Sequence, residues 1–557
     1  MDLEGAPSDP RRGHGQEQGQ GKSPWRHPAG IATGLLLALA LLVAGILRSD
    51  FLIDDAYISF RYARSWAEWG VPAYNPGEQP PVEGYSNPSW VWLLRQLHAQ
   101  GVQIEFASRL IGGLCGAATL VWMVLWLRSR TRLGDLELTV AALALALFPP
   151  FVLWCTGGLE TALFGLLAFG TFAVAGSGDA RWTRGVAAGA LGLLLALTRP
   201  EGLAFAVALL AAAQLQRGRP LRPSPGLLFG WLLPVLVGYG AFLAWRHGVH
   251  GAWLPNTVHA KTGGLPLGRG LRTVASFGLL FITPLLALLA PVLSRREDRP
   301  LAMATSGVLL LALAENIVVG GDWMPMFRLL APFSAFLAIA FVLALRRLPG
   351  GALLGMAGVV LAALPAFDLH AAPRSWREAL VFRSFARGYE SEWERRATGL
   401  RNVANFLAIG EGLGSVAEPS DSITMGAIGA VGWASGITIL DRNGLIDPEI
   451  ARGAPVRAEA SAGHDRRVPR SWFLDQEPTY WEALLVQGEI LSAEAPGGRK
   501  AARAIAARLG EEDAELLQRS LPEYHVLAGD EPRTLVLLRN VEPSVGAPFW
   551  QALQGRR

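Results

Sequence analysis

Long apolar runs alternate with short polar segments between residues 30 and 367. Runs close to the ~20 residues that a helix needs to cross a bilayer predict membrane-spanning helices. We expect about 11 spans, near residues 30–47, 105–127, 137–155, 159–176, 185–198, 202–215, 226–245, 274–293, 301–319, 328–345 and 351–367. Residues 30–369 are therefore predicted to form a polytopic α-helical membrane domain.

After residue 370 the pattern changes, because apolar runs become short and charge rises. The stretches RSWREAL and SEWERRATGLRNVANFL predict helices. From Gly412 to Asp447, short apolar runs stand between Gly and Asp turns, as strands and loops do. A late pair of apolar runs, YHVLAG and RTLVLLRNV, predicts a hairpin around GDEP. Residues 370–557 are therefore predicted to form a soluble α/β domain.

The composition agrees with a membrane protein, since 51% of the residues are hydrophobic, only 17% are charged and the mean hydropathy is +0.30. These proportions exclude an ordinary soluble globule. The net charge of +4 does not indicate nucleic-acid binding, because the basic residues stand in short clusters between apolar runs. Cys115 and Cys155 lie in apolar segments, so neither a disulfide framework nor a zinc site is expected.

The basic clusters predict the orientation of the spans. They fall on alternate loops, on the same side as residues 1–29, a polar segment that we expect to be a disordered cytoplasmic tail. We expect the first span to be an uncleaved anchor. Ser89–Gln100 must then lie along the interface as an amphipathic helix, with Trp90 and Trp92 at headgroup depth. With the basic loops in the cytoplasm and 11 crossings, the first external loop, 48–104, and the C-terminal domain are expected outside the cytoplasm.

The first external loop combines paired carboxylates, arginines and aromatic residues. Its stretches DDAYISFRYAR, YNPGE and VEGYSNPSW resemble membrane glycosyltransferases of the GT-C superfamily, in particular the bacterial branch that includes the mycobacterial terminal arabinofuranosyltransferases. Later stretches are similar to that family too: TGGLETALF, LTRPEG, WLPNTVHAK, GGDWMPMFR and GAIG…DRNGLIDPEIAR. The resemblance spans most of the chain. It implies a GT-C-like fold and transfer of a sugar from a polyprenyl-phosphate donor.

Asp54 and Asp55 are the candidate catalytic residues, because sugar transfer needs a base for the acceptor hydroxyl. Neighbouring side chains diverge in direction, so the two are not expected to share one task. One of them can orient a partner or bind a divalent cation, since oxygen ligands suit Mg²⁺ or Mn²⁺. The competing interpretation is an N-cap for the helix AYISFRYARSWAEW, a position that Asp favours.

Cations in other loops on the same side are candidates for binding the donor phosphate: Arg328, Lys261, His259 and Arg199. A charge near hydrocarbon needs a partner or a function. One alternative is that Arg199 pairs with Glu201. Another is that Arg328 and Lys261 reach lipid headgroups. Asp322 can equally hold Arg328 in place.

Residues expected to contact the sugar or the acceptor combine carboxylates, an amide and aromatic rings: Glu83, Tyr85, Asn87, Asp322 and Trp323. A carboxylate and an amide can hold vicinal hydroxyls above an aromatic ring. Turn chemistry around Gly84 and Pro88 is the alternative for the first three. For Trp323 the alternative is an ordinary interfacial position. Glu160 is interpreted as complementing a helix N-terminus.

Together these features predict an integral membrane glycosyltransferase of the cell envelope that acts by inverting displacement. The resemblance implies a bacterial inner membrane, a donor sugar with arabinofuranose among the choices, and an extracytoplasmic glycan, lipid or protein as acceptor. A transporter or flippase of a lipid-linked or small solute is the alternative, because intramembrane charges and Pro- or Gly-broken spans also occur there. The sequence has no Walker A motif, which argues against an ATP-driven pump.

Overall fold

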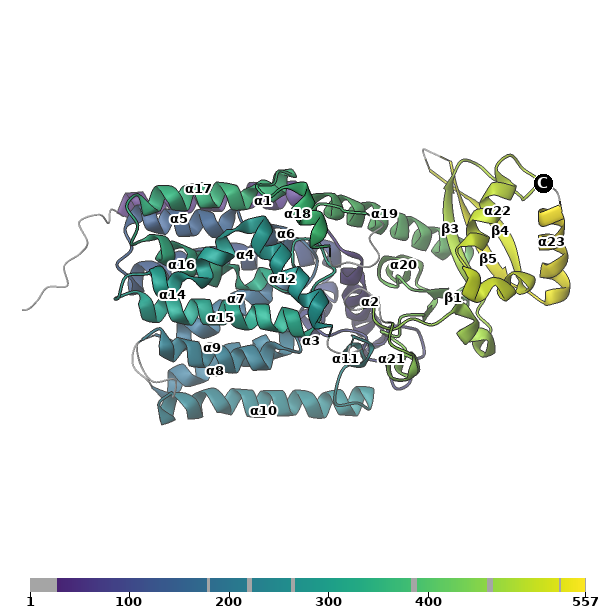
Figure 1. The fold of residues 1–557 in the computed structure, drawn as a ribbon. Coiled ribbons are helices and arrows are strands. Elements are labelled where there is room, and N and C mark those ends of the chain that lie inside the picture. Colours follow the sequence, from purple (N-terminus) through teal and green to yellow (C-terminus); the bar gives the residue numbers. More distant parts are fainter. Residues whose placement is uncertain are drawn as a thin grey trace, which may run out of the picture.

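The structure is a computed structural model that describes residues 28–177, 181–217, 223–261, 266–381, 388–457, 464–529 and 532–555. Figure 1 shows a bundle of long helices lying side by side and, at one end of it, a smaller domain that contains a sheet. Helix α19 (Glu392–Val416) leads from the bundle to the sheet. Residues 1–27 of the predicted tail lie outside the described residues, so its disorder stays a prediction.

Every apolar run predicted to span the membrane coincides with one helix or with a succession of helices. These are α1 (Pro28–Ser49), α4 (Ile104–Arg130), α5 (Asp135–Ala146), α6 (Pro149–Trp154), α7 (Thr161–Ala175), α8 (Trp182–Thr198), α9 (Gly202–Leu215), α10 (Pro225–His250), α12 (Leu267–Phe281), α13 (Thr283–Leu288), α14 (Ala290–Leu293), α15 (Arg299–Val318), η1 (Ala331–Phe333), α16 (Ser334–Leu345), α17 (Gly351–Ala363) and η2 (Leu364–Phe367). In the described part of the chain, 4 helices are long and apolar enough to cross a membrane: α1, α4, α10 and α15. Shorter apolar helices accompany them, and the number of crossings stays a prediction.

Two of the predicted spans are interrupted near prolines. The run 137–155 is divided between α5 and α6, because Pro149 and Pro150 have no N–H to donate to the preceding turn. The run 274–293 is divided at Ile282, whose φ of 58° lies in the left-handed region, just before Pro284. The bundle therefore consists of long helices packed against shorter helical segments.

The first external loop contains two of its own helices, α2 (Asp54–Trp69) and α3 (Pro88–His98). The predicted helix at 89–100 is thus present, but protein and not lipid headgroups surrounds the Trp90 side chain. Its ring is fully buried, and its Nε1 donates to the Gly158 carbonyl at 3.1 Å. The reason is that α3 packs against α2, α4 and α8, which covers the face that holds Trp90 and Leu94. Trp92, on the other face, is exposed.

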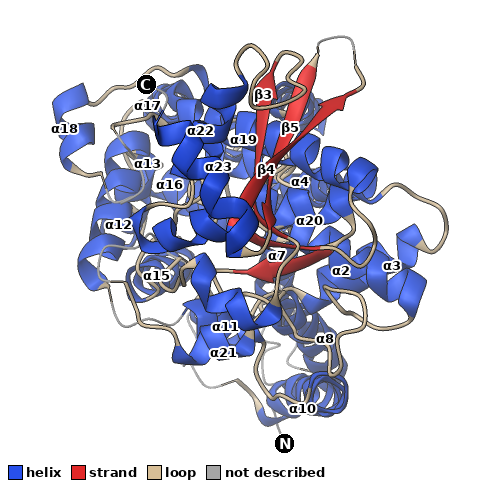
Figure 2. Cartoon of the chain, turned by 90° about the vertical axis from the view of Figure 1, so that its right-hand side faces the viewer, coloured by secondary structure: helices blue, strands red, loops and turns tan. Residues whose placement is uncertain are grey.

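The C-terminal domain contains the predicted sheet. Its strands are β1 (Ser422–Met425), β2 (Thr438–Asp441), β3 (Tyr480–Gln487), β4 (Ser520–Leu527) and β5 (Arg533–Asn540), in the order β2-β1-β3-β5-β4. β1 pairs in parallel with β2 and β3, whereas β5 pairs antiparallel with β3 and β4, which confirms the predicted hairpin. Figure 2 shows the strands among helices. The remaining helices are α11 (Asn256–Lys261), α18 (Arg374–Ala379), α20 (Gly429–Ser435), α21 (Pro448–Gly453), η3 (Arg470–Gln476), α22 (Gly498–Ala507), η4 (Glu511–Arg519) and α23 (Pro543–Gly555).

The first external loop and the C-terminal domain are joined by buried polar contacts. The Arg61 guanidinium of α2 donates to the carbonyls of Gly432 (2.5 Å) and Ile437 (2.8 Å). The Tyr74 hydroxyl donates to the Ile428 carbonyl at 2.5 Å. Buried hydrogen bonds to a charged group each contribute about 1.5–3 kcal/mol. The two parts are therefore held in one arrangement, and the space between them is defined.

Candidate active site

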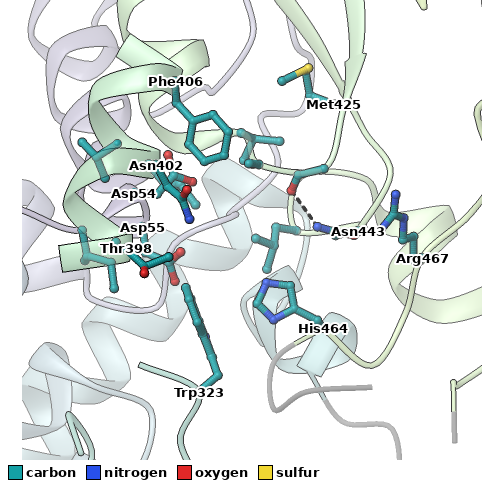
Figure 3. A pocket seen from close by; sticks show the side chains of 18 of the residues that line it. Asp54, Asp55, Trp323, Thr398, Asn402, Phe406, Met425, Asn443, His464 and Arg467 are labelled. Carbon is teal, nitrogen blue, oxygen red and sulfur yellow. Dashed lines mark hydrogen bonds between the residues drawn. The ribbon is translucent and has the colours of Figure 1, made fainter. Parts of the chain in front are cut away.

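A cavity of about 1180 Å³ lies between the first external loop and the C-terminal domain. On the bundle side it is lined by the start of α2, the end of α11 and the loop before η1; on the other side by α19 and by loops of the sheet domain. Figure 3 shows Asp54 and Asp55 on one wall, and Asn443, His464 and Arg467 on the wall opposite. This volume exceeds the roughly 300–1,000 Å³ of ordinary small-molecule pockets. It has room for more than one small molecule.

Asp54 and Asp55 occupy the first turn of α2. The residue that precedes the helix is Ile53, and no side chain caps it, so the N-cap interpretation of the two aspartates is wrong. The Asp54 Oδ1 instead accepts a hydrogen bond from the Ala430 N–H of α20, 2.8 Å away. Within the described residues, no protein group donates to the Asp55 carboxylate. One aspartate is therefore fixed, and its neighbour is free to bind a substrate or a cation.

The environment of Asp54 favours its protonated form. Burial raises the pKa of Asp54 to about 7, and the charge of Asp55 adds to this effect, while the hydrogen bond from Ala430 opposes it. A general base acts best when its pKa lies near the working pH. Asp54 thus has one oxygen fixed, a second available, and a pKa suited to proton transfer.

Lys261 is the predicted phosphate-binding cation that reaches the cavity. It ends α11, whose position is fixed at the other end of the helix. There the Asn256 side chain donates to the carbonyls of Gly444 (2.8 Å) and Leu445 (3.0 Å), and its N–H donates to the Glu83 carbonyl at 3.0 Å. His259, on the same helix, is half-buried and does not line the cavity.

Arg328 and Arg199 meet at Glu160 outside the cavity lining. The Arg328 Nη2 lies 2.5 Å from one Glu160 oxygen, and the Arg199 Nε lies 3.8 Å from the same atom. The second Glu160 oxygen accepts from Asn87 at 2.8 Å. Arg199 also pairs with Glu201 at 2.7 Å, which confirms the alternative foreseen for it. These charges balance one another inside the protein.

Glu160 is the residue of this network whose importance the sequence did not reveal. It precedes α7 but does not cap it, since its carboxylate is engaged by the two arginines and by Asn87. A single carboxylate between apolar runs was the available signal, because burying such a charge requires partners.

The loop that carries Asp322 and Trp323 contributes Trp323 and Pro325 to the cavity. The Asp322 carboxylate is buried and accepts from the backbone N–H of Met324 (3.0 Å) and of Leu329 (2.9 Å). It therefore shapes the loop. Trp323 lines the cavity, and its ring lies 5.0 Å from that of His464. Its predicted contact with sugar is compatible with this position.

The three predicted sugar ligands of the first external loop are buried beside the cavity and do not line it. Glu83 pairs with Arg246 at 2.7 Å. The Tyr85 ring contacts that of Tyr62, with centroids 4.7 Å apart. The Asn87 amide donates to Glu160 as described above. Their role as sugar contacts stays a prediction, and the structure assigns each a partner that stabilises the loop.

The residues that sequence reasoning missed come from the C-terminal domain. They are polar side chains of α19, of the loop after β2 and of the loop before η3: Thr398, Asn402, Asn443, His464 and Arg467. The stretch DRNG holds Asn443 because the Asp441 carboxylate accepts from the N–H groups of Asn443 (2.8 Å) and Leu445 (2.5 Å). Only this stretch gave a signal, as one of those that resemble the glycosyltransferases.

In the described residues there is no group of three or more His, Cys, Asp or Glu side chains able to hold an ion. Asp54 and Asp55 supply two carboxylates, so any cation held there would need oxygen ligands from substrate or water.

Comparison with known proteins gives a limited set of likenesses. Residues 389–530 match the profile of a domain of unknown function, DUF8728. Among curated proteins no match is found. The chain is similar to ArnT of Cupriavidus metallidurans bound to undecaprenyl phosphate, with 15% identity, a TM-score of 0.48, and 91% of this chain and 98% of that chain covered. It is also similar to the archaeal oligosaccharyltransferase AglB of Archaeoglobus fulgidus in complex with an inhibitory peptide and a dolichol-phosphate, with 12% identity, a TM-score of 0.46, and coverages of 92% and 74%. The function proposed below rests on the cavity and on the sequence of the loops that line it.

Proposed function

We propose that this chain is an integral membrane glycosyltransferase that moves a sugar from a polyprenyl-phosphate donor to an extracytoplasmic acceptor. The observation that supports this most is the cavity, which brings Asp54, Asp55 and Lys261 together at the end of a bundle of apolar helices. A donor anchored in the membrane can reach it from the bundle side. An acceptor can reach it from the side of the C-terminal domain.

Asp54 is the base in this proposal. The free Asp54 oxygen takes the proton of the acceptor hydroxyl. At the same time the hydroxyl oxygen attacks the anomeric carbon of the donor sugar, and the bond from this carbon to the lipid phosphate breaks. A single displacement inverts the configuration at the anomeric carbon. Because Ala430 fixes the other Asp54 oxygen, the base is held in place before the substrates bind.

Lys261 stabilises the departing phosphate, since it is the candidate cation that lines the cavity. Arg328, Arg199 and His259 stay candidates for further phosphate contacts in the donor complex. If a divalent cation such as Mg²⁺ or Mn²⁺ takes part, Asp54 and Asp55 would hold it, and it would neutralise phosphate charge.

The finer parts of the proposal follow the sequence resemblance. They are an arabinofuranosyl donor, a glycan, lipid or protein acceptor in cell wall biogenesis, and a bacterial inner membrane with the N-terminus in the cytoplasm and the C-terminal domain outside.

The test is transfer of labelled sugar from polyprenyl-phosphate donors by the purified protein, with and without a chelator. Asp54→Asn should lose transfer by about 10²-fold or more, as expected when a general base is removed. The matched control is Asp50→Asn, because Asp50 is exposed, pairs with Arg109 and does not line the cavity. Normal turnover by Asp54→Asn would refute its role. No transfer from any donor, together with lipid movement across vesicles, would establish the flippase instead.

A further inference from the structure

The wall of the cavity that faces the two aspartates is rich in arginine. Five arginines of the C-terminal domain line it: Arg442, Arg457, Arg467, Arg470 and Arg508. They come from the loop after β2, the loop before η3, the start of η3 and the end of α22. None of them was foreseen from the sequence, and the proposed transfer reaction does not use them.

Two of these arginines are structural. Arg442 and Arg470 are almost fully buried and share the Asp513 carboxylate, at 3.6 Å and 3.5 Å. Arg442 also pairs with Glu512 at 3.0 Å, and Arg470 pairs with Glu482. Buried charges of this kind need such partners, and here they have them.

Arg457 and Arg467 differ from these two. Both are exposed to the cavity, and among the described residues neither guanidinium has a hydrogen-bond or ion-pair partner. A short antiparallel bridge between Val456 and Arg466 brings their two segments together. The backbone next to Arg467 is fixed, because Val468 exchanges hydrogen bonds with Arg442 at 2.9 and 3.0 Å.

The charge of this wall is therefore positive. Five arginines face three partner carboxylates, those of Glu482, Glu512 and Asp513, which leaves two positive charges in excess. The wall belongs to the C-terminal domain, beyond the end of the bundle, whereas the phosphate of a membrane-anchored donor must stay near the bilayer. An anion bound here thus belongs to the other substrate.

We infer that the acceptor is an anionic glycan, whose carboxylate or phosphate is bound by Arg457 and Arg467 while one of its hydroxyls reaches Asp54. The inference rests on the proposed function, because it names the class of the acceptor. Guanidinium groups suit both anions, since they offer paired N–H donors in one plane.

Binding of an anionic glycan can be measured by calorimetry on the full-length protein in detergent. No donor is added, so the measurement does not depend on sugar transfer. The probes are trigalacturonic acid, its methyl ester as the neutral match, and a mannotriose that carries one phosphate monoester. At least one anionic probe should bind about tenfold or more tightly than the ester, as expected for charge-assisted hydrogen bonds. The stronger of the two identifies the anion as carboxylate or phosphate.

The preference for the anionic probe over the neutral ester should fall to about threefold or less in Arg457→Gln and in Arg467→Gln. It should persist in Arg499→Gln. Arg499 is an exposed arginine of α22 that does not line the cavity. A second measurement on the wild-type protein uses ~1 M salt, which screens charges beyond about 3 Å and should weaken the preference. The inference would be overturned if neither anionic probe bound more tightly than the ester, or if the preference survived both substitutions. If the wild-type protein showed no sugar transfer but kept its preference for an anionic probe over the ester, only the proposed function would be refuted.

Discussion

The Asp54 carboxylate accepts a hydrogen bond from the Ala430 N–H at 2.8 Å, across 376 residues of sequence. This contact places the proposed base at the junction between the first external loop and the C-terminal domain. The domain is thus part of the site and not a separate appendage. Any change that moves α20 should therefore affect the reaction, even where it touches no substrate.

The pKa of Asp54 predicts how transfer depends on pH. A base must be ionised to act, and the pKa of Asp54 is raised to about 7. Transfer should therefore rise by nearly tenfold per pH unit below 7 and level off above it. Initial rates between pH 5.5 and 8.5, at saturating donor, measure this. A profile that is flat across that range would contradict the assignment of Asp54 as base.

The same pKa predicts a stability effect that can be seen without activity. An unfolded aspartate titrates near pH ~4, so between that value and about 7 the folded state binds the additional proton. Apparent thermal stability should then fall as pH rises through this window. Asp54→Asn should remove this part of the pH dependence. Asp55→Asn should move it to lower pH, because the Asp55 charge helps to raise the pKa of Asp54.

Gly429 tests whether the position of α20 matters. A Cβ atom at this residue would collide with the backbone carbonyl of Asp54, so Gly429→Ala should push Ala430 away from the carboxylate. A misplacement of about 1 Å can lower a rate by about 10²-fold, and we expect a loss of at least tenfold in transfer.

The matched control is Gly453→Ala at the end of α21, where a Cβ atom would meet nothing within 4 Å. It should transfer sugar at the wild-type rate. Transfer by Gly429→Ala at that same rate would show that the contact between α20 and Asp54 is not required.

The hydrogen bonds of Arg61 attach the C-terminal domain to α2. Arg61→Met keeps the apolar stem but leaves the carbonyls of Gly432 and Ile437 without their donor. The expected cost is about 2–6 kcal/mol, because each buried carbonyl left without a donor costs about 1–3 kcal/mol. A lower apparent Tm and faster proteolytic release of the C-terminal domain would show it. Arg64→Met is the control on the same helix, because Arg64 is only half-buried and should cost less.

The sequence was sufficient for those features that depend on local pattern. The apolar runs predicted the helices of the bundle, and the alternation after residue 370 predicted the sheet and its last hairpin. Pro149 and Pro150 divide a predicted span. This local effect was not predicted, because the spans were defined by the length of apolar runs alone. The burial of Trp90 within the protein was not predicted, because periodicity identifies the apolar face of a helix but not whether lipid or protein covers it.

The site itself could be predicted only on one side. Asp54, Asp55, Lys261 and Trp323 line the cavity as their loops suggested. The opposite wall could not be foreseen, because Arg457 and Arg467 are exposed charges in a polar stretch, and no local pattern distinguishes them from ordinary surface residues. Their position depends on how α20 packs on α2, which is a contact between distant segments.

The Glu160 carboxylate holds two arginines together. Glu160→Gln removes the charge that Arg328 and Arg199 share. Arg199 keeps its pair with Glu201, but Arg328 loses its ion pair, and an uncompensated buried charge costs about 3–5 kcal/mol. The variant should therefore have a markedly lower apparent Tm. Arg328→Gln in addition should recover part of the loss, with a coupling energy of about 1–3 kcal/mol.

Arg374→Gln is the reference for an ordinary surface pair, because Arg374 and Glu378 are exposed and such pairs contribute at most about 1 kcal/mol. Additive effects of Glu160→Gln and Arg328→Gln would mean that the two residues do not depend on each other. The opposite result, strong coupling together with reduced transfer in both single variants, would tie this buried network to the cavity, since Asn87, Glu160 and Arg328 join the first external loop to the loops before α7 and η1.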